Sequence, residues 1–215
     1  MALTAPSGRR EANKIRTREA VVSALFTLLA TEPLDQLTAE RVADAAGISR
    51  RTFFNYFPSV EAVMVYRDQQ VLDLLGAKLA ARPIDEPLMD SLNSVIDELF
   101  TVELLVAVSH TWRAIECSAA ANRFALEALH EVLTDLGRTW AADRLTAARG
   151  CAPDELELAV VTAICMAAFD AAKRHWLTTF TGPIDEAARQ RFVAMVHRAF
   201  EYARPGVERL VVRPD

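Results

Sequence analysis

Apolar residues recur along this chain at intervals of three and four positions, the spacing of one face of an α-helix. Strand-like alternation of useful length occurs only near residues 207–212. The pattern therefore predicts an all-α protein. Helices are expected at about residues 9–31, 38–46, 50–57, 59–81, 88–118, 121–149, 154–180 and 184–203, with a break allowed near Ser109. The first helix should turn Ile15, Val22, Leu25, Phe26 and Leu29 inward.

Proline and glycine positions separate these helices into groups. Pro58 ends the early helices, and Arg82-Pro83-Ile84-Asp85-Glu86-Pro87 is typical of a linker. We expect a disordered N-terminus at 1–8, a small three-helix head at 9–58, a larger helical bundle at 59–204 and a tail at 205–215. A long helix beginning near Ser59 should join the head to the bundle.

Residues 38–57 show the pattern of two short helices joined by a tight turn. Thr38 and Ser49 are suited to cap the two helices, because their hydroxyls can accept from amides one turn further on. Gly47 can end the first helix in the left-handed conformation. A helix, a glycine turn and a second capped helix form the helix-turn-helix pattern, whose second helix enters the major groove of DNA.

The second helix of this pair should have distinct inner and outer faces. Phe53 and Phe57 lie four residues apart and should close the core of the head. Arginine at the start of a recognition helix can form a bidentate pair with guanine. Two alternatives remain open: Arg51 contacts only phosphate, or Phe54 belongs to the core. The residues expected on the outer side are Arg50, Arg51, Phe54 and Asn55, and the two arginines are suited to read bases.

The first helix begins with a run of basic residues that includes Arg16 and Arg18. Such a run is often only a solvated helix face. Directly before a helix-turn-helix, contact with DNA phosphates is the better interpretation. The charge distribution agrees: residues 1–58 carry 8 Lys and Arg against 6 Asp and Glu, a net +2, whereas residues 59–215 carry 16 against 23, a net −7.

The three cysteines show neither zinc-ligand spacing nor a disulfide framework, which fits a reducing cytoplasm. The N-terminus lacks the apolar region of a signal peptide. The longest uncharged run, residues 158–169, is too short to span a bilayer. We expect a cytoplasmic protein that neither crosses nor binds a membrane.

With these motifs the chain resembles the TetR family of bacterial transcriptional regulators over about residues 10–63. The resemblance is carried by Leu37-Thr38, Val42-Ala43, Ala46-Gly47-Ile48-Ser49, Thr52-Phe53-Phe54, Tyr56-Phe57, and Ser59 with Glu61. It implies that the outward residues of the second helix read bases, and that Thr38, Thr52 and Tyr56 contact phosphates. It also implies that residues 59–204 form a ligand-binding and dimerisation domain.

Two positions depart from the family pattern. The family usually has tyrosine where Phe54 stands, so a phosphate-binding hydroxyl is absent and Phe54 offers only apolar contact. It commonly has lysine where Val60 stands, so a charged phosphate contact is missing. Arg51 replaces a usually small residue and is suited to compensate. These changes affect the expected affinity more than the mode of binding.

The helix predicted at 154–180 carries an alanine every fourth residue, which allows another helix to approach closely. Packing inside one monomer is the plain alternative. The resemblance favours a homodimer in which the last two helices meet their symmetry mates. The interface candidates are Ala159, Ala163, Ala167, Ala171, Phe192, Val196 and Ala199.

Aromatic and sulfur-bearing residues between positions 110 and 176 suggest a largely apolar cavity for a small-molecule effector. Taken alone, a residue of this kind more often belongs to an ordinary core than to a ligand cavity. The candidates are His110, Trp112, Cys117, Phe124, Trp140, Cys165, Met166, Phe169 and Trp176.

Taken together, the sequence predicts a non-enzymatic DNA-binding regulator without a cofactor or bound metal. Such a protein would most simply be a repressor that binds a pseudo-palindromic operator as a dimer and is released by a small apolar or aromatic ligand. One rival is a helical metal-binding enzyme, because Glu127 and His130 form half of a di-iron motif, but no second copy exists. Another is a protein-binding adaptor, which would not need Arg50 and Arg51.

Overall fold

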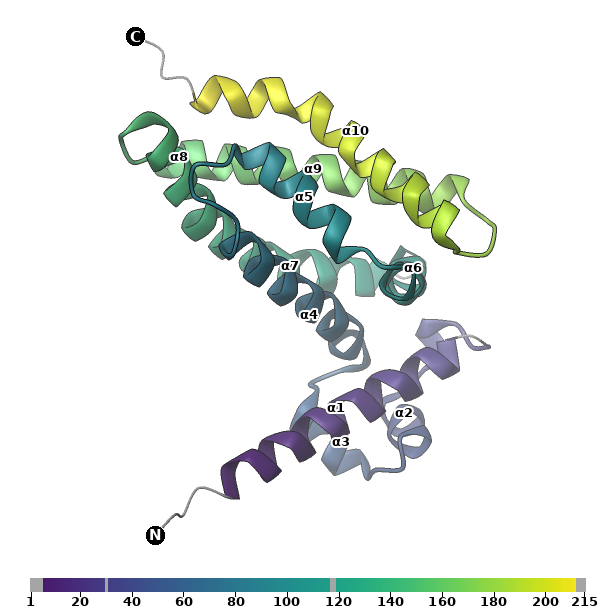
Figure 1. Ribbon diagram of the computed structural model, residues 1–215. Helices are drawn as coiled ribbons and strands as arrows, with labels where there is room; N and C mark the ends of the chain where they lie inside the picture. Colours follow the sequence, from purple (N-terminus) through teal and green to yellow (C-terminus); the bar gives the residue numbers. More distant parts are fainter. Residues whose placement is uncertain (1–5, 30, 117–118, 212–215) are drawn as a thin grey trace. The chain divides into compact units, whose positions relative to one another are not determined.

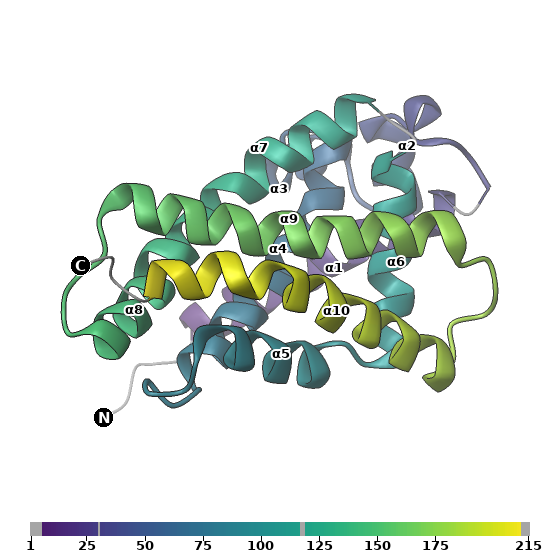
Figure 2. The ribbon, with the colours of Figure 1, turned by 90° about the horizontal axis from the view of Figure 1, so that it is seen from above.

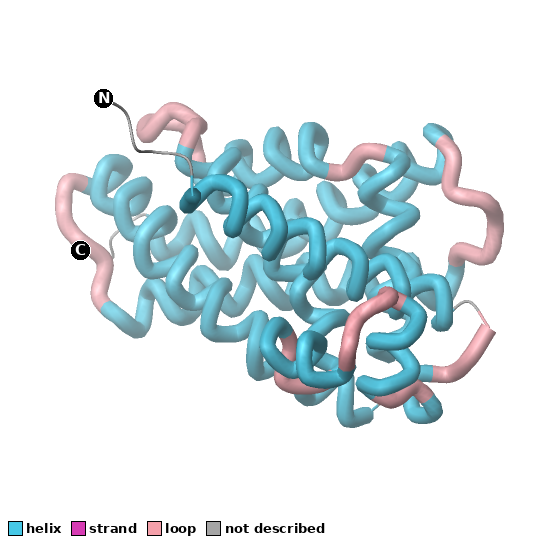
Figure 3. Tube along the Cα trace, turned by 90° about the horizontal axis from the view of Figure 1, so that it is seen from below, coloured by secondary structure: helices cyan, strands magenta, loops and turns pink. Residues whose placement is uncertain are grey.

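The computed structural model describes residues 6–29, 31–116 and 119–211, and all regular structure within them is helical (Figures 1 and 3). The α-helices are α1 (Pro6–Leu29), α2 (Ala39–Ala45), α3 (Arg50–Tyr56), α4 (Val60–Ala80), α5 (Leu88–Leu99), α6 (Val102–Glu116), α7 (Ala119–Leu136), α8 (Ala142–Arg149), α9 (Glu155–Thr179) and α10 (Glu186–Val211). A 3-10 turn, Leu34–Gln36, precedes α2, and a π-helical segment, Gly137–Ala141, joins α7 to α8. The predicted all-α class is confirmed.

The chain divides into two compact units, one within residues 1–68 and 110–126 and the other within 69–109 and 127–215. Three helices, α4, α6 and α7, contribute residues to both units. The first unit therefore holds the predicted three-helix head together with the beginning of α4 and a segment from later in the sequence.

The core of the first unit is formed by apolar faces of α1, α2, α3 and the start of α4. Val22 and Leu25 of α1 are buried as predicted, whereas Ile15 is 44% exposed and lies outside this core. Val42 of α2 and Phe53 of α3 have no exposed surface. Burial of such side chains stabilises the head by roughly 1.5–3 kcal/mol per residue.

In the second unit, α9 and α10 lie side by side, and α5 lies along α10 (Figures 1 and 2). An aromatic cluster holds these helices together. Phe100 stacks on Phe169 with ring centroids 6.1 Å apart, and its edge meets Phe192 at 4.9 Å. Trp176 meets Phe192 at 5.5 Å and donates from Nε1 to Oγ of Ser109 at 3.3 Å.

The break that the sequence allowed near Ser109 is not found there. Ser109 lies inside α6, where it is 2% exposed and serves as the acceptor for Trp176. The chain instead breaks between α5 and α6, at Phe100 and Thr101. Thr101 caps the start of α6, because its Oγ1 accepts a hydrogen bond from the amide of Leu104 at 3.2 Å.

Three further expectations about helix boundaries are also wrong. The first helix begins at Pro6, so Pro6–Gly8 do not belong to a disordered N-terminus, while residues 1–5 lie outside the described part. The helix expected at 121–149 is interrupted at Gly137. The last helix runs through Pro205 to Val211, so residues 205–211 are not a separate tail. Val207 is 1% exposed, and Arg149 donates from Nη1 to the carbonyl of Leu210 at 3.0 Å, which holds this extension in place.

Candidate nucleic-acid interface

The turn between α2 and α3 is built as its residues predict. Oγ1 of Thr38 accepts the amide of Arg41 at 3.2 Å, and Oγ of Ser49 accepts the amide of Thr52 at 3.1 Å. Gly47 has φ of 68°, the left-handed region that residues with a Cβ rarely adopt. These local bonds fix the direction in which α3 leaves the turn.

The two faces of α3 separate core from surface. Phe53 is fully buried and Phe57 is 3% exposed, and their rings lie 6.1 Å apart. Phe54 is 46% exposed, which excludes the alternative that it belongs to the core. The structure thus brings the four predicted base-reading residues to the exposed surface of one short helix: Arg50, Arg51, Phe54 and Asn55.

Phe54 also interacts with its neighbours on this helix. The guanidinium of Arg50, one turn earlier, lies over its ring at 5.6 Å from the centroid. The ring meets Phe53 edge to face at 5.4 Å and an interplanar angle of 85°. Contact with a buried aromatic on one side and a cation on the other restricts the orientation of the Phe54 ring.

The predicted phosphate-contacting residues lie in different environments. Thr38 and Arg16 are exposed, although the Thr38 hydroxyl already caps α2 and Arg16 donates from Nη2 to Oδ1 of Asn13 at 2.6 Å. Thr52 is half-buried, and its hydroxyl shares a hydrogen bond of 2.8 Å with that of Ser49. Tyr56 is half-buried at the end of α3.

Arg18, which its sequence context predicted to be a phosphate contact, packs against aromatic rings inside the first unit. Its guanidinium lies 5.9 Å from the ring centroid of Tyr56 and 5.6 Å from that of Tyr66, and its Nε is buried without a hydrogen-bond partner. Tyr66, in α4, was not singled out by its sequence pattern, and its ring also meets Phe57 at 5.5 Å. Arg18 therefore helps to join α1, α3 and α4 in addition to supplying charge near Tyr56.

Two other arginines of the first unit are held by partners within it. Arg41 pairs with Glu32 at 2.7 Å, and this hydrogen bond raises the pKa of Arg41. The guanidinium of Arg67 lies 4.6 Å from the ring centroid of Phe26, and burial lowers its pKa. Val60, where the resembled family commonly has lysine, is 7% exposed and belongs to the core.

The nine residues predicted to line a ligand cavity do not form one group in the structure. His110 is exposed and Trp112 is buried in the first unit; Cys117, and the side chain of Phe124, lie outside what the structure describes. The other five belong to the second unit. Trp140 and Trp176 are buried, and their indole nitrogens donate to different partners, the carbonyl of Leu79 and the hydroxyl of Ser109. Cys165, Met166 and Phe169 are half-buried. Burial raises the pKa of the Cys165 thiol to about 12.

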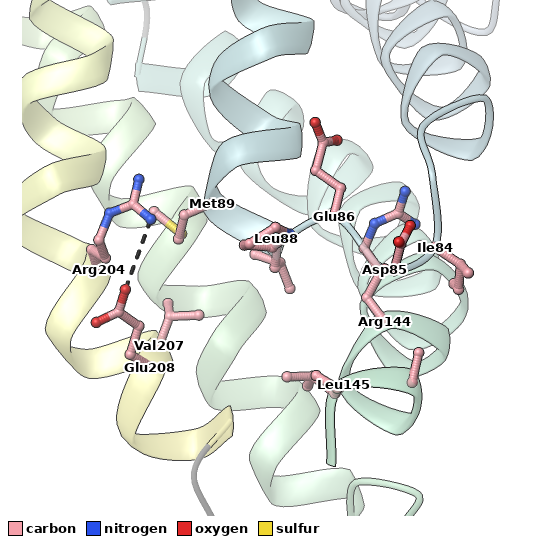
Figure 4. A pocket seen from close by; sticks show the side chains of 13 residues that line it. Ile84, Asp85, Glu86, Leu88, Met89, Arg144, Leu145, Arg204, Val207 and Glu208 are labelled. Atoms are coloured by element: carbon pink, nitrogen blue, oxygen red, sulfur yellow. Dashed lines mark ion pairs between the residues drawn. The ribbon is translucent and has the colours of Figure 1, made fainter. Parts of the chain in front are cut away.

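A pocket of about 270 Å³ lies elsewhere in the second unit, and none of the nine candidates lines it (Figure 4). It is formed by the linker before α5, the start of α5, α8 and the last turns of α10. No local sequence pattern indicates this pocket, because its walls come from segments distant in the chain. Its lining residues are Ile84, Asp85, Glu86, Pro87, Leu88, Met89, Arg144, Leu145, Ala147, Ala148, Arg204, Val207 and Glu208.

The predicted interface residues fall into two groups. Ala159, Ala163, Ala167 and Ala171 are exposed along α9, with Leu156 and Val160 (72% and 37% exposed) continuing this apolar face. Phe192 and Val196 have no exposed surface, so their assignment to a dimer interface is wrong: they form the core between α9 and α10. Ala199 is half-buried.

Within the described residues, no group of three or more His, Cys, Asp or Glu side chains could hold a metal ion. Glu127 and His130, the half-motif of the metal-enzyme rival, are both exposed on α7. None of the described helices is both long enough and apolar enough to cross a membrane.

Comparisons with known proteins agree with the geometry of the head. A family model described as bacterial regulatory proteins, tetR family, matches residues 21–65. The chain is 39% identical over 85 residues to the HTH-type transcriptional regulator EthR of Mycobacterium tuberculosis, which covers 37% of this chain and 39% of that protein. EthR of Mycolicibacterium smegmatis is 44% identical over 62 residues, or 28% of this chain and 29% of that protein. The matched segment thus covers about two fifths or less of the length of each relative.

The fold similarity extends over nearly the whole chain. The crystal structure of Thermus thermophilus FadR, a TetR family transcriptional repressor in complex with lauroyl-CoA, superposes with a TM-score of 0.54 at 21% identity. The superposition covers 92% of this chain and 96% of FadR. By its helix-turn-helix head the chain matches the tetR family of bacterial regulatory proteins over residues 21–65, and its all-helical fold is similar to that of the TetR family repressor FadR.

Proposed function

We propose that this protein is a repressor that binds a pseudo-palindromic DNA operator as a homodimer in the cytoplasm and is released by a small, largely apolar ligand. The exposed face of α3 is the observation that carries the proposal. It offers two arginines, an aromatic ring and an amide, while Phe53 and Phe57 anchor the helix in the core. Arginine is the side chain best suited to bidentate recognition of guanine in the major groove.

The exposed alanines of α9 support the dimer. Small side chains at positions 159, 163, 167 and 171 form one stripe that no other part of the described chain covers. A second copy related by a twofold axis could pack against this stripe, because small residues allow close approach of two helices. Such a dimer would present two copies of α3 to half-sites about one helical turn of DNA apart.

Release by a ligand is supported by the family and by a relative of the same fold. The FadR structure holds lauroyl-CoA, a molecule with a long apolar chain. For this protein, release requires only that a ligand bind the DNA-incompetent state more tightly. A roughly hundredfold difference shifts the balance by about 2.7 kcal/mol.

Selection from a random pool of DNA duplexes tests the binding mode. Purified protein should enrich a twofold-related pair of half-sites, and sedimentation should give two chains per duplex. Enrichment of unrelated sequences, or no enrichment at low salt, would contradict the proposal and favour the protein-binding adaptor.

Linkage tests the ligand response separately. If a ligand weakens operator binding, the operator must weaken binding of that ligand by the same factor. Ligand affinity measured with and without saturating operator should therefore differ. Identical affinities would leave a regulator that binds DNA regardless of that ligand.

A further inference from the structure

The pocket of about 270 Å³ in the second unit combines an apolar interior with one unusual cation (Figure 4). Side chains of Leu88, Met89, Leu145 and Val207 face its interior from α5, α8 and α10. The volume is slightly below the roughly 300–1,000 Å³ of pockets for drug-sized ligands. The space therefore suits a small molecule with an apolar body.

Arg144, in the wall of this pocket, is a buried charge with unused hydrogen-bonding capacity. It is 5% exposed, and its guanidinium lies 4.5 Å from the ring centroid of Trp140. Nη2 donates to the carbonyl oxygens of Leu79 at 3.3 Å, Arg82 at 2.9 Å and Pro83 at 3.1 Å. Nε is buried without a partner. Its direct hydrogen bonds go to neutral carbonyls, and the nearby carboxylates of Glu86 and Asp143 act on it only through space. A further anion in direct contact would stabilise this guanidinium, because burial penalises its charge.

The other charged groups of the pocket already have partners or lie in solvent. Glu86 accepts from Arg82 and from Ser91, the latter at 2.5 Å. Arg204 pairs with Glu201 at 2.7 Å and Asp90 at 2.9 Å, and more distantly with Glu208 at 3.8 Å. Asp85 is exposed, so water and salt screen its charge. Arg144 is thus the charged group with most to gain from a ligand.

We propose that this pocket binds a small amphipathic carboxylate, with its apolar chain among Leu88, Met89, Leu145 and Val207 and its carboxylate on the guanidinium of Arg144. The site is separate from the nine aromatic and sulfur-bearing residues predicted from the sequence. Arg144 also holds the carbonyls at the C-terminal end of α4, and α4 begins four residues after α3 ends. A ligand here would therefore touch the residue that secures this helix. An effector role for the ligand rests on the proposed function, whereas binding itself does not.

Titration calorimetry on the full chain without DNA tests the site. The probes are octanoate, octan-1-ol and octylammonium, which share a chain and differ in head group. Octanoate should bind about tenfold or more tightly than the other two, as expected for a charge-assisted hydrogen bond. Tighter binding of octylammonium, or equal binding of all three, would overturn the assignment of the carboxylate to Arg144.

Two variants locate the binding. Ala148, exposed on α8, lines the pocket, so Ala148→Trp should fill it and abolish octanoate binding. The control Ala152→Trp changes an exposed alanine outside the lining and should bind octanoate as the unmodified protein does. Octanoate binding that survives Ala148→Trp, or is lost equally in both variants, would overturn the site.

Arg144→Met tests the head-group contact within the same pocket. If it folds, as checked by thermal denaturation, octanoate affinity should fall to that of octan-1-ol while octan-1-ol binding persists. Unchanged preference for octanoate would contradict the proposal. If Arg144→Met does not fold, the comparison of Ala148→Trp with Ala152→Trp still tests whether octanoate binds in this pocket. These calorimetric measurements contain no DNA, so a failure of operator binding would not change their outcome. The proposed ligand site and the proposed DNA-binding function can therefore be contradicted independently.

Discussion

The guanidinium of Arg50 lies over the ring of Phe54, 5.6 Å from its centroid and one turn away on α3. Both side chains are exposed, whereas Phe53 is fully buried. The contact gives Phe54 a role that does not need the hydroxyl of the family's usual tyrosine. It orients an arginine proposed to read bases, and so reduces the rotamer freedom that Arg50 must lose on binding.

Replacing this ring should weaken operator binding. Phe54→Leu keeps an apolar side chain but removes the cation–π contact, which at an exposed site contributes about 0.5–1 kcal/mol. Affinity for the selected operator, measured by fluorescence anisotropy, should fall about two- to fivefold. The control Phe54→Tyr keeps the ring and should bind at least as tightly as the unmodified protein. Equal affinity of the leucine variant would show that the contact contributes nothing to binding.

Charges placed on the exposed stripe of α9 should separate the dimer. The double variant Ala163→Glu with Ala167→Glu would bring like charges together across the proposed twofold axis, and sedimentation should give monomers with weakened operator binding. The matched control is Ala77→Glu with Ala81→Glu, two exposed alanines four residues apart in and just after α4. A dimer that persists in the first variant would place the interface elsewhere.

The close approach of Gly137 to α9 should make this glycine necessary. A Cβ at Gly137 would overlap Oγ1 of Thr162 and lie 3.0 Å from its Cβ, so Gly137→Ala should destabilise the fold by about 1–3 kcal/mol in urea denaturation. At Gly76 the nearest atom would be Cδ1 of Leu136 at 3.5 Å, an ordinary contact. Gly76→Ala should instead stabilise its helix by about 0.5–1 kcal/mol. Adding Thr162→Ala should restore much of the stability lost at Gly137, and failure to do so would contradict the steric explanation.

Stability should depend on pH through Glu86. Hydrogen bonds from Arg82 and Ser91 lower the pKa of Glu86 from 4.5 to about 2. Because the folded state favours the ionised carboxylate, the stabilisation is complete above about pH 4.5 and is lost as the pH falls toward 2. In thermal unfolding, Glu86→Gln should lower the melting temperature at neutral pH and have a diminishing effect through this range. The exposed control Glu127→Gln should show no such convergence. A constant difference between Glu86→Gln and the unmodified protein would contradict this pKa.

The head could be predicted from sequence because its determinants are local. Thr38, Gly47 and Ser49 act through hydrogen bonds and φ angles within four residues, and Phe53 and Phe57 reveal their face by spacing alone. The helix-turn-helix pattern is accordingly found where it was expected.

The second unit was predicted less well, because contacts between residues far apart in the sequence determine where its helices end and which side chains are buried. A proline at 205 normally favours a helix end, but packing of Val207 and the bond from Arg149 to Leu210 carry α10 past it. Phe192 fits an interface stripe by spacing, yet Phe100 and Trp176 enclose it within one chain. The pocket around Arg144 depends on the approach of α8 to the end of α4, which no local pattern encodes.

Base-resolved binding of single variants tests most directly whether α3 reads base pairs through its arginines. Arg50→Ala and Arg51→Ala should each cost about 1–3 kcal/mol on the selected operator and relax the preference at one position of each half-site. Arg16→Ala, which changes an exposed arginine of α1, should instead weaken binding to all duplexes alike and reduce the salt dependence. If Arg50→Ala and Arg51→Ala weaken binding equally on operator and random duplexes, α3 contacts only the backbone, and the proposed mode of recognition is wrong.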